Sequence, residues 1–213
     1  MEKNKKIKIG CASAFWGDTN DAAAQLVNSN ELNYLVFDYL AEVTMSILAA
    51  SQMKNPNLGY ANDFISQTGP LLSEIKAQGI KVISNAGGIN PIACREALIK
   101  EADKQGLNFK IAIVEGDNLF HQRDDFLKKR VQDIDTNSDM PESVTSINAY
   151  LGAEPIRRAL EEGADIIITG RCVDSAVTLG PLMYEFGWNS TDYDLLAAGS
   201  LAGHIIECGA QCN

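Results

Sequence analysis

Three loops of this chain carry side chains that can bind or transform a small molecule. They are residues 11–18, 84–91 and 169–174, and each follows a short apolar run typical of a β-strand. In parallel α/β folds the loops at the carboxyl ends of the strands meet at one edge of the sheet, and ligands bind there. The sequence therefore predicts one shared polar site built from the three loops.

Acidic side chains on or just after the predicted strand ends are the candidates for catalysis. Paired carboxylates can share general acid and base roles or bind a hard cation. Glu42 lies in an apolar stretch predicted to be buried, and a buried acid needs a partner or a function. The candidate catalytic residues are Glu42, Asp18 and Asp117, with Asp38 and Glu115 nearby. The competing interpretation is helix capping and loop solvation.

The loop over residues 84–91 contains two adjacent glycines, Gly87 and Gly88. Glycines let a backbone approach a ligand, and unpaired N–H groups at a helix start favour an anion. The pattern is neither G-x-G-x-x-G nor a P-loop, and we predict no cofactor. Asn85, Gly87, Gly88 and Asn90 are candidate ligand-binding residues, and a tight structural turn is the alternative.

The loop over residues 169–174 offers an arginine beside a glycine. Arg171 can fork onto a carboxylate or phosphate. Asp174 can cap the following helix, pair with Arg171 or face a substrate. Thr169, Gly170, Arg171 and Asp174 complete the predicted ligand-binding set.

His204, Glu207 and Cys208 share one helix face, since they are three and four residues apart. That spacing suits a metal ligand pair or a cysteine activated by histidine. A single histidine is more often a satisfied structural residue, so we predict no metal site.

The elements that must position these residues follow an alternating pattern. Strands are predicted at residues 6–11, 34–37, 81–84, 109–114 and 165–169. The helices between them include 40–53, 62–78, 91–105, 154–162 and 175–186, and 195–208 is expected to be a closely packed, small-residue helix. Residues 118–143 are charged and aperiodic, with one helix near 124–131, and form an inserted excursion. The pattern predicts an α/β fold with a parallel sheet of βαβ units, in an open doubly wound arrangement.

Composition excludes several classes of protein. A net charge of -10 disfavours a nucleic-acid partner. No apolar stretch approaches the roughly 20 residues that a membrane span needs. Five cysteines without a secretion signal indicate reduced thiols and a cytoplasmic protein.

Several segments resemble the acyclic terpene utilisation (AtuA) family, N-terminal domain. The matching segments are residues 12–18, 38–44, 55–61, 84–91, 115–117, 148–153, 163–171 and 203–211. They occur in one order over nearly the whole chain, which makes the resemblance specific. Family members continue past the last segment, so we expect 1–213 to be a single AtuA-like domain that lacks the remainder.

The resemblance implies a role in the catabolism of acyclic isoprenoids such as citronellol and geraniol, whose intermediates are CoA thioesters. One hypothesis is an enzyme acting on an acyl-CoA or carboxylate intermediate by hydratase or lyase chemistry. The alternative is a non-catalytic ligand-binding or subunit protein with structural acidic loops. Because the chain ends after an apolar segment, we expect it to form a homo-oligomer or to bind a separate chain that carries the remainder.

Overall fold

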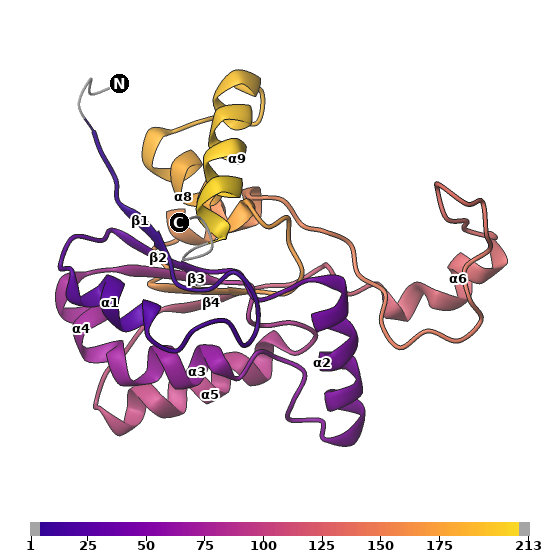
Figure 1. Ribbon diagram of the computed structural model, residues 1–213, viewed down its shortest axis with the longest axis horizontal. Helices are drawn as coiled ribbons and strands as arrows, with labels where there is room; N and C mark the ends of the chain where they lie inside the picture. Colours follow the sequence, from indigo (N-terminus) through magenta and orange to yellow (C-terminus); the bar gives the residue numbers. More distant parts are fainter. Residues whose placement is uncertain (1–4, 209–213) are drawn as a thin grey trace.

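The computed structural model describes residues 5–208, and at its centre lies one open, parallel sheet (Figure 1). Every predicted strand is confirmed: those at 34–37 and 81–84 have the predicted bounds, and the other three are shorter. In the described residues the sheet has five strands in the order β1-β2-β3-β5-β4. They are β1 (Ile9–Cys11), β2 (Tyr34–Phe37), β3 (Lys81–Ser84), β4 (Ile111–Val114) and β5 (Ile166–Thr169). All neighbouring pairs are parallel, so all the carboxyl ends lie at one edge.

Both faces of the sheet are buried, which explains why the strands read as continuous apolar runs. Successive side chains of a strand point to opposite faces. In β2, Leu35 and Phe37 therefore join one core, whereas Tyr34 and Val36 join the other. The expected doubly wound arrangement is confirmed.

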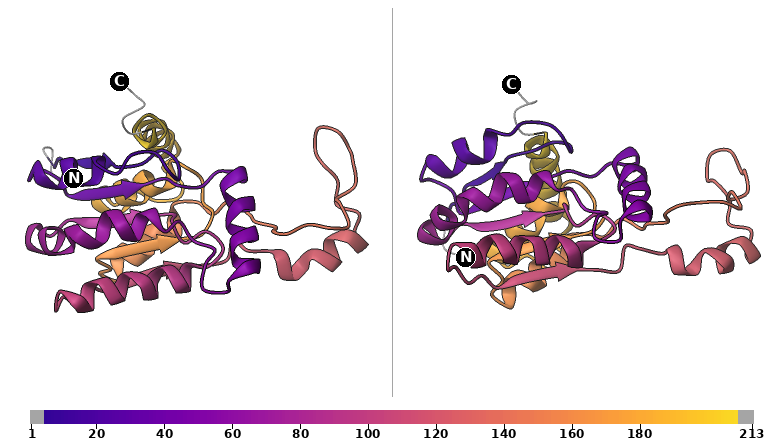
Figure 2. Two further views of the ribbon diagram at one scale, coloured as in Figure 1. Left: turned by 60° about the horizontal axis from the view of Figure 1, so that its bottom comes forward. Right: turned by 90° about the horizontal axis from the view of Figure 1, so that it is seen from below.

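Helices cover each face, as Figures 1 and 2 show. One face carries α1 (Ala22–Asn28), α3 (Asp63–Thr68), α4 (Leu72–Gln78) and α5 (Pro91–Lys104). The other carries α7 (Glu154–Glu161), α8 (Ala176–Phe186) and α9 (Tyr193–Glu207). The remaining long helix, α2 (Glu42–Lys54), stands beside the carboxyl edge of the sheet (Figure 2). In the described part of the chain, no helix is long and apolar enough to cross a membrane.

The helix predicted over residues 62–78 is not continuous. It is divided into α3, the short 3-10 helix η1 (Gly69–Leu71) and α4. Pro70 is the physical reason, because it has no N–H to donate and its ring clashes with the preceding turn of an α-helix.

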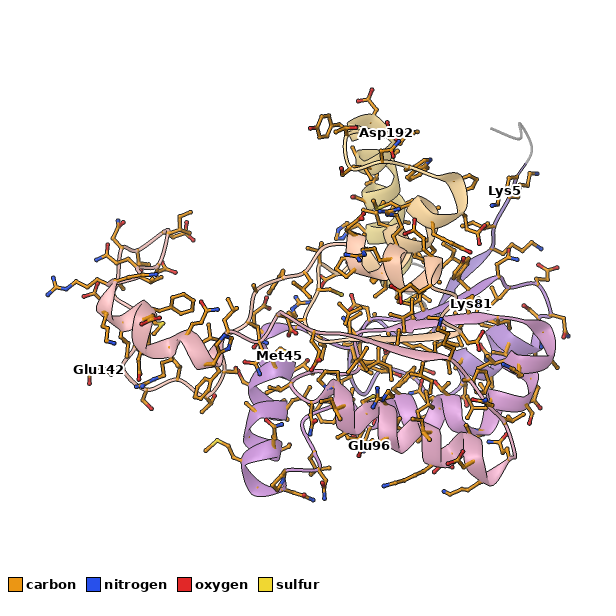
Figure 3. All side chains as sticks on the ribbon, turned by 180° about the vertical axis from the view of Figure 1, so that it is seen from behind. Lys5, Met45, Lys81, Glu96, Glu142 and Asp192 are labelled. Carbon is orange, nitrogen blue, oxygen red and sulfur yellow. The ribbon has the colours of Figure 1, made fainter. Side chains whose placement is uncertain are left out.

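The predicted excursion is confirmed as a segment that projects from the body (Figures 1 and 3). It holds the 3-10 helix η2 (Phe120–Gln122) and α6 (Arg123–Lys128). Glu142, labelled in Figure 3, lies far from the sheet. Ile134 is 91% exposed, so this segment contributes little to the main core.

Helix α9 packs closely on α8, as its small residues predicted. A Cβ atom added to Gly203 would lie 2.8 Å from the Ser175 carbonyl oxygen, and one on Gly199 would lie 2.7 Å from Leu179 Cδ1. Both glycines are buried on the face of α9 that also carries Glu207. The close approach therefore sets the position of Glu207.

We expect Gly203→Ala to lower the free energy of unfolding by about 1–3 kcal/mol, because the added methyl group meets backbone atoms that cannot move aside. Helix propensity alone would give the opposite sign, a gain of about 1 kcal/mol. Gly152→Ala is the control, since nothing lies within 4 Å of its added Cβ. Chemical denaturation measures both variants, and equal stabilities would contradict the close packing of α9.

Candidate functional site

The three predicted loops lie at one edge of the sheet. They follow β1, β3 and β5, whose carboxyl ends point the same way. The prediction of a shared edge is confirmed. The acids that come closest together at this edge are Asp38, Asp174 and Glu207. The sequence instead indicates Glu42, Asp18 and Asp117 as the catalytic acids.

Arg171 is the central cation of this edge. It is 3% exposed, and its Nη1 donates to Asp174 Oδ1 at 2.7 Å and to the Cys172 carbonyl at 2.9 Å. Its guanidinium lies over the Tyr150 ring, 4.0 Å from the centroid. The pairing with Asp174 was one of the alternatives that the sequence left open. Arg171 Nε is buried and has no hydrogen-bond partner among the described residues.

Three carboxyl groups converge beside Arg171. One oxygen each of Asp38, Asp174 and Glu207 lies within 4.8 Å of the others. Asp38 follows β2, Asp174 lies in the loop after β5, and Glu207 is the last residue of α9. Asp38 and Glu207 are buried. We call these three residues the carboxylate cluster.

Burial and mutual repulsion disfavour the charged forms in this cluster. Burial, together with the Asp174 carboxylate, raises the pKa of Asp38 to about 7, against a lowering by the Asn85 hydrogen bond. Burial, followed by the Asp174 charge, also raises the pKa of Glu207. Cys11 is adjacent, and its thiol donates to the carbonyls of Ser13 and Glu207. Burial raises the pKa of Cys11 to about 12, so this group is a neutral thiol.

Asn85 and Asp117 hold this edge in place. Asn85 is fully buried, donates to Asp38 Oδ1 at 2.5 Å and accepts from the Tyr39 backbone N–H at 2.7 Å. Asp117 Oδ2 accepts from the Arg171 backbone N–H and from Asn148 Nδ2, both at 2.9 Å. Burial raises the pKa of Asp117, against the lowering effect of these hydrogen bonds. Both side chains orient their neighbours through these contacts.

Gly170 is required by Asp117, because a Cβ atom at this position would lie 2.4 Å from Asp117 Oδ1. Thr169 is 1% exposed, and its hydroxyl donates to the Gly170 carbonyl at 2.8 Å. Their contacts shape the loop that presents Arg171, and a direct contact with a ligand stays a prediction for both.

The expectation that Gly87 and Gly88 present N–H groups to an anion is not met. The Gly87 N–H donates to the Thr169 carbonyl at 3.0 Å and that of Gly88 to the Asn85 carbonyl at 3.3 Å. Both glycines are buried. Asn90 caps α5 by accepting from the Ala93 N–H, and its amide donates to the carbonyls of Pro56 and Leu58. This loop is therefore a tight structural turn, the alternative interpretation, because the N–H groups of both glycines are hydrogen-bonded to backbone carbonyls.

The expectation that Glu42 is buried is wrong. Its side chain is 78% exposed at the start of α2, where Oε1 lies 3.7 Å from Arg171 Nη2. The apolar stretch around it also exposes Val43, so α2 buries only one side. Asp18 lies outside the carboxylate cluster, and its carboxylate accepts from the Ala14 N–H at 3.0 Å. Periodicity did not show these differences, because α2 stands at the end of the sheet rather than on its face.

Glu207 is the site residue that sequence reasoning left out. It was considered only as a neighbour of His204, and the structure joins His204 Nδ1 to Glu207 Oε1 at 2.9 Å. Gly199, Gly203 and Glu207 are four residues apart and all buried. That spacing was a signal in the sequence, since it places an acid on the face that the glycines bring close to a neighbour. The described cysteines Cys11, Cys94 and Cys172 form no disulfide, as expected, and Cys212 lies outside the described residues.

Comparison with known families decides what kind of chain this is. The model of the acyclic terpene utilisation family protein AtuA matches residues 7–213. The chain belongs to this family. No curated protein and no solved structure matches it significantly. The resemblance seen in the sequence is confirmed, and membership of the AtuA family links the chain to acyclic terpene utilisation.

We expect Gly88→Ala to be more destabilising than Gly79→Ala by about 1–3 kcal/mol. Both positions have left-handed backbone, with φ of 55° and 68°, so both substitutions carry the same backbone strain. Only at Gly88 would the new Cβ meet other atoms, at 2.5 Å from Leu48 Cδ1. Equal melting temperatures for the two variants would show that the space around Gly88 is open after all.

Proposed function

We propose that the carboxyl edge of the sheet is the active site of an enzyme of acyclic isoprenoid catabolism. It would act on an acyl-CoA or carboxylate intermediate by hydratase or lyase chemistry. The observation that carries the proposal is the convergence of the carboxylate cluster beside Arg171. Carboxyl groups and a fixed cation at the carboxyl ends of parallel strands are the groups that proton transfer to a bound anion requires.

Arg171 is the proposed anchor for the anionic group of the substrate. Its Nη1 donates to Asp174, whereas in the described part of the chain its Nε has no hydrogen-bond partner and its Nη2 has the exposed Glu42 at 3.7 Å. The Nε and Nη2 edge of a guanidinium matches a carboxylate or phosphate with two parallel hydrogen bonds. An incoming anion would take the place of the Glu42 side chain. Glu42 then acts as an exchangeable partner of Arg171 rather than as the buried acid that the sequence indicated.

A cleft beside α2, lined by both apolar and polar side chains, is the proposed place for the hydrocarbon part of such a substrate. Its volume is about 430 Å³. Ala49 and Met53 of α2 line it, together with Ile89 after β3 and Asn118 after β4. The lining also includes Phe120 and residues 143–146. A branched acyclic chain can bury its apolar surface there.

The proposal is tested with the CoA thioesters of the acids derived from geraniol and citronellol. We expect turnover that mass spectrometry detects as addition or loss of water, or as chain cleavage. Arg171→Lys keeps the charge but loses the two-pronged geometry, so we expect KM to rise about ten- to a hundredfold. Asp38→Asn removes one carboxyl group of the cluster and should lower kcat.

Asp194→Asn is the matched control, because Asp194 is exposed at the far end of α9. It should turn over as the wild type does. Absence of both binding and turnover with these thioesters in the folded wild-type chain would contradict the proposed function.

The non-catalytic subunit role also has one observation in its favour. The outer side of α9 exposes apolar side chains, with Tyr193 73%, Leu201 61% and Ile205 58% exposed. Exposed apolar patches on a helix commonly mark contacts between chains. Light scattering on the purified chain should then show association, and Leu201→Glu should reduce it. A monomer with a sharp melting transition would count against this alternative.

A further inference from the structure

The carboxylate cluster is arranged as a site for a cation. Asp38, Asp174 and Glu207 each bring one oxygen to within 4.8 Å of the others. Two of the three side chains are buried, where like charges repel strongly and hydration is lost. Among the described residues, Arg171 contacts Asp174 and the exposed His204 contacts Glu207, whereas no ion pair reaches Asp38. The three carboxyl groups therefore outnumber their cationic partners.

Glu207 has a buried oxygen without a partner among the described residues, and the residue as a whole is 8% exposed. Its Oε2 is fully buried and accepts no hydrogen bond from residues 5–208, the part of the chain that the structure describes. A buried carboxylate oxygen without a partner costs folding free energy, so such groups usually serve a ligand or an ion. The close packing of Gly203 on Ser175 places Glu207 at the cluster. This placement comes from the backbone and does not depend on a bound cation.

Each carboxyl group has one oxygen in contact with a donor outside the cluster, and its second oxygen remains for a ligand. Asn85 donates to Asp38 Oδ1, Arg171 to Asp174 Oδ1 and His204 to Glu207 Oε1. Outer donors of this kind orient the carboxylates of metal sites and fix which oxygen faces the ion. An accidental group of acids on a surface would not have one oriented donor for each member.

We propose that Asp38, Asp174 and Glu207 bind one divalent cation of the Mg²⁺ or Mn²⁺ type. The ligand atoms are carboxylate oxygens, which hard cations prefer. Of the thiols near the cluster, Cys11 donates its hydrogen to backbone carbonyls, and Cys172 Sγ lies 3.6 Å from Thr169 Oγ1, so neither is a free ligand for a softer metal. Mg²⁺ keeps several waters and takes few protein carboxylates, so positions remain for a substrate oxygen.

The proposal deepens the proposed function, since a cation here would polarise a carbonyl or carboxylate oxygen of the bound substrate. It supplies positive charge to a cluster whose carboxyl groups outnumber their cationic partners. Arg171 and the cation would then hold two different oxygens of one anionic substrate. Cation binding itself needs no substrate, so it can be measured separately.

The test is calorimetric titration of the metal-free 213-residue chain with MnCl₂ and MgCl₂. We expect one equivalent to bind to the wild type. Glu207→Gln and Asp38→Asn keep the shape of the side chain but remove a ligand charge, so binding should weaken about ten- to a hundredfold or more. Asp194→Asn on the same helix should bind as the wild type does.

Thermal melting with and without the cation distinguishes a lost cation site from a variant that does not fold. In a chelator, Glu207→Gln and Asp38→Asn should melt at or above the wild-type temperature, because a buried like charge has been removed. Added Mn²⁺ should raise the melting temperature of the wild type and of Asp194→Asn, but not that of the two cluster variants. A wild type that binds neither cation, or a Glu207→Gln variant that binds Mn²⁺ equally well, would overturn the proposal.

The two proposals fail in different ways. Normal cation binding without turnover of any thioester contradicts the proposed function alone. Turnover that a chelator leaves unchanged, in a chain that binds no cation, contradicts the cation site alone.

Discussion

The carboxyl edge of the sheet depends on the ion pair between Arg171 and Asp174. A guanidinium that is 3% exposed is stable only with anionic and polar partners, because its hydration is lost. Asp174, the Cys172 carbonyl and the Tyr150 ring supply them. Asp174 in turn lies close to the other two carboxyl groups of the cluster, whose pKa values are raised by burial first and by the Asp174 charge second. Arg171 lowers both pKa values by a smaller amount, so the ion pair stabilises the edge without neutralising it.

The rest of the fold holds these groups at fixed positions. The Asp117 side chain accepts from the backbone of Arg171 and fixes the loop that carries it. Asn85 joins the ends of β2 and β3 by binding both Asp38 and the Tyr39 backbone. Helix α9 crosses α8 where Gly199 and Gly203 allow close approach, and this brings Glu207 to the edge. Three elements that are distant in sequence therefore meet at one charged centre.

The carboxylate cluster lowers the free energy of unfolding. Grouped, partly desolvated carboxyl groups oppose folding, and the apolar cores on both faces of the sheet must compensate. Proteins keep such groups where a ligand uses them, because preorganised charge acts more strongly away from water. The proposed substrate class, an acyclic chain with an anionic end, would use both Arg171 and the cleft beside α2. Membership of the AtuA family gives the metabolic context, and the roles of individual residues are our proposals.

The sequence by itself determined the fold class and the edge of the sheet at which the three polar loops lie. Continuous apolar runs such as Ile166–Thr169 are long enough for strands buried on both faces, and their spacing requires parallel crossovers. It also indicated Arg171, Asp174 and the excursion. Only the tertiary structure decided that Glu42 is exposed, that the amides of Gly87 and Gly88 are used internally, and that Glu207 joins Asp38. The physical reason is that periodicity reports which face of an element is apolar, whereas burial of one side chain and the meeting of two depend on long-range packing.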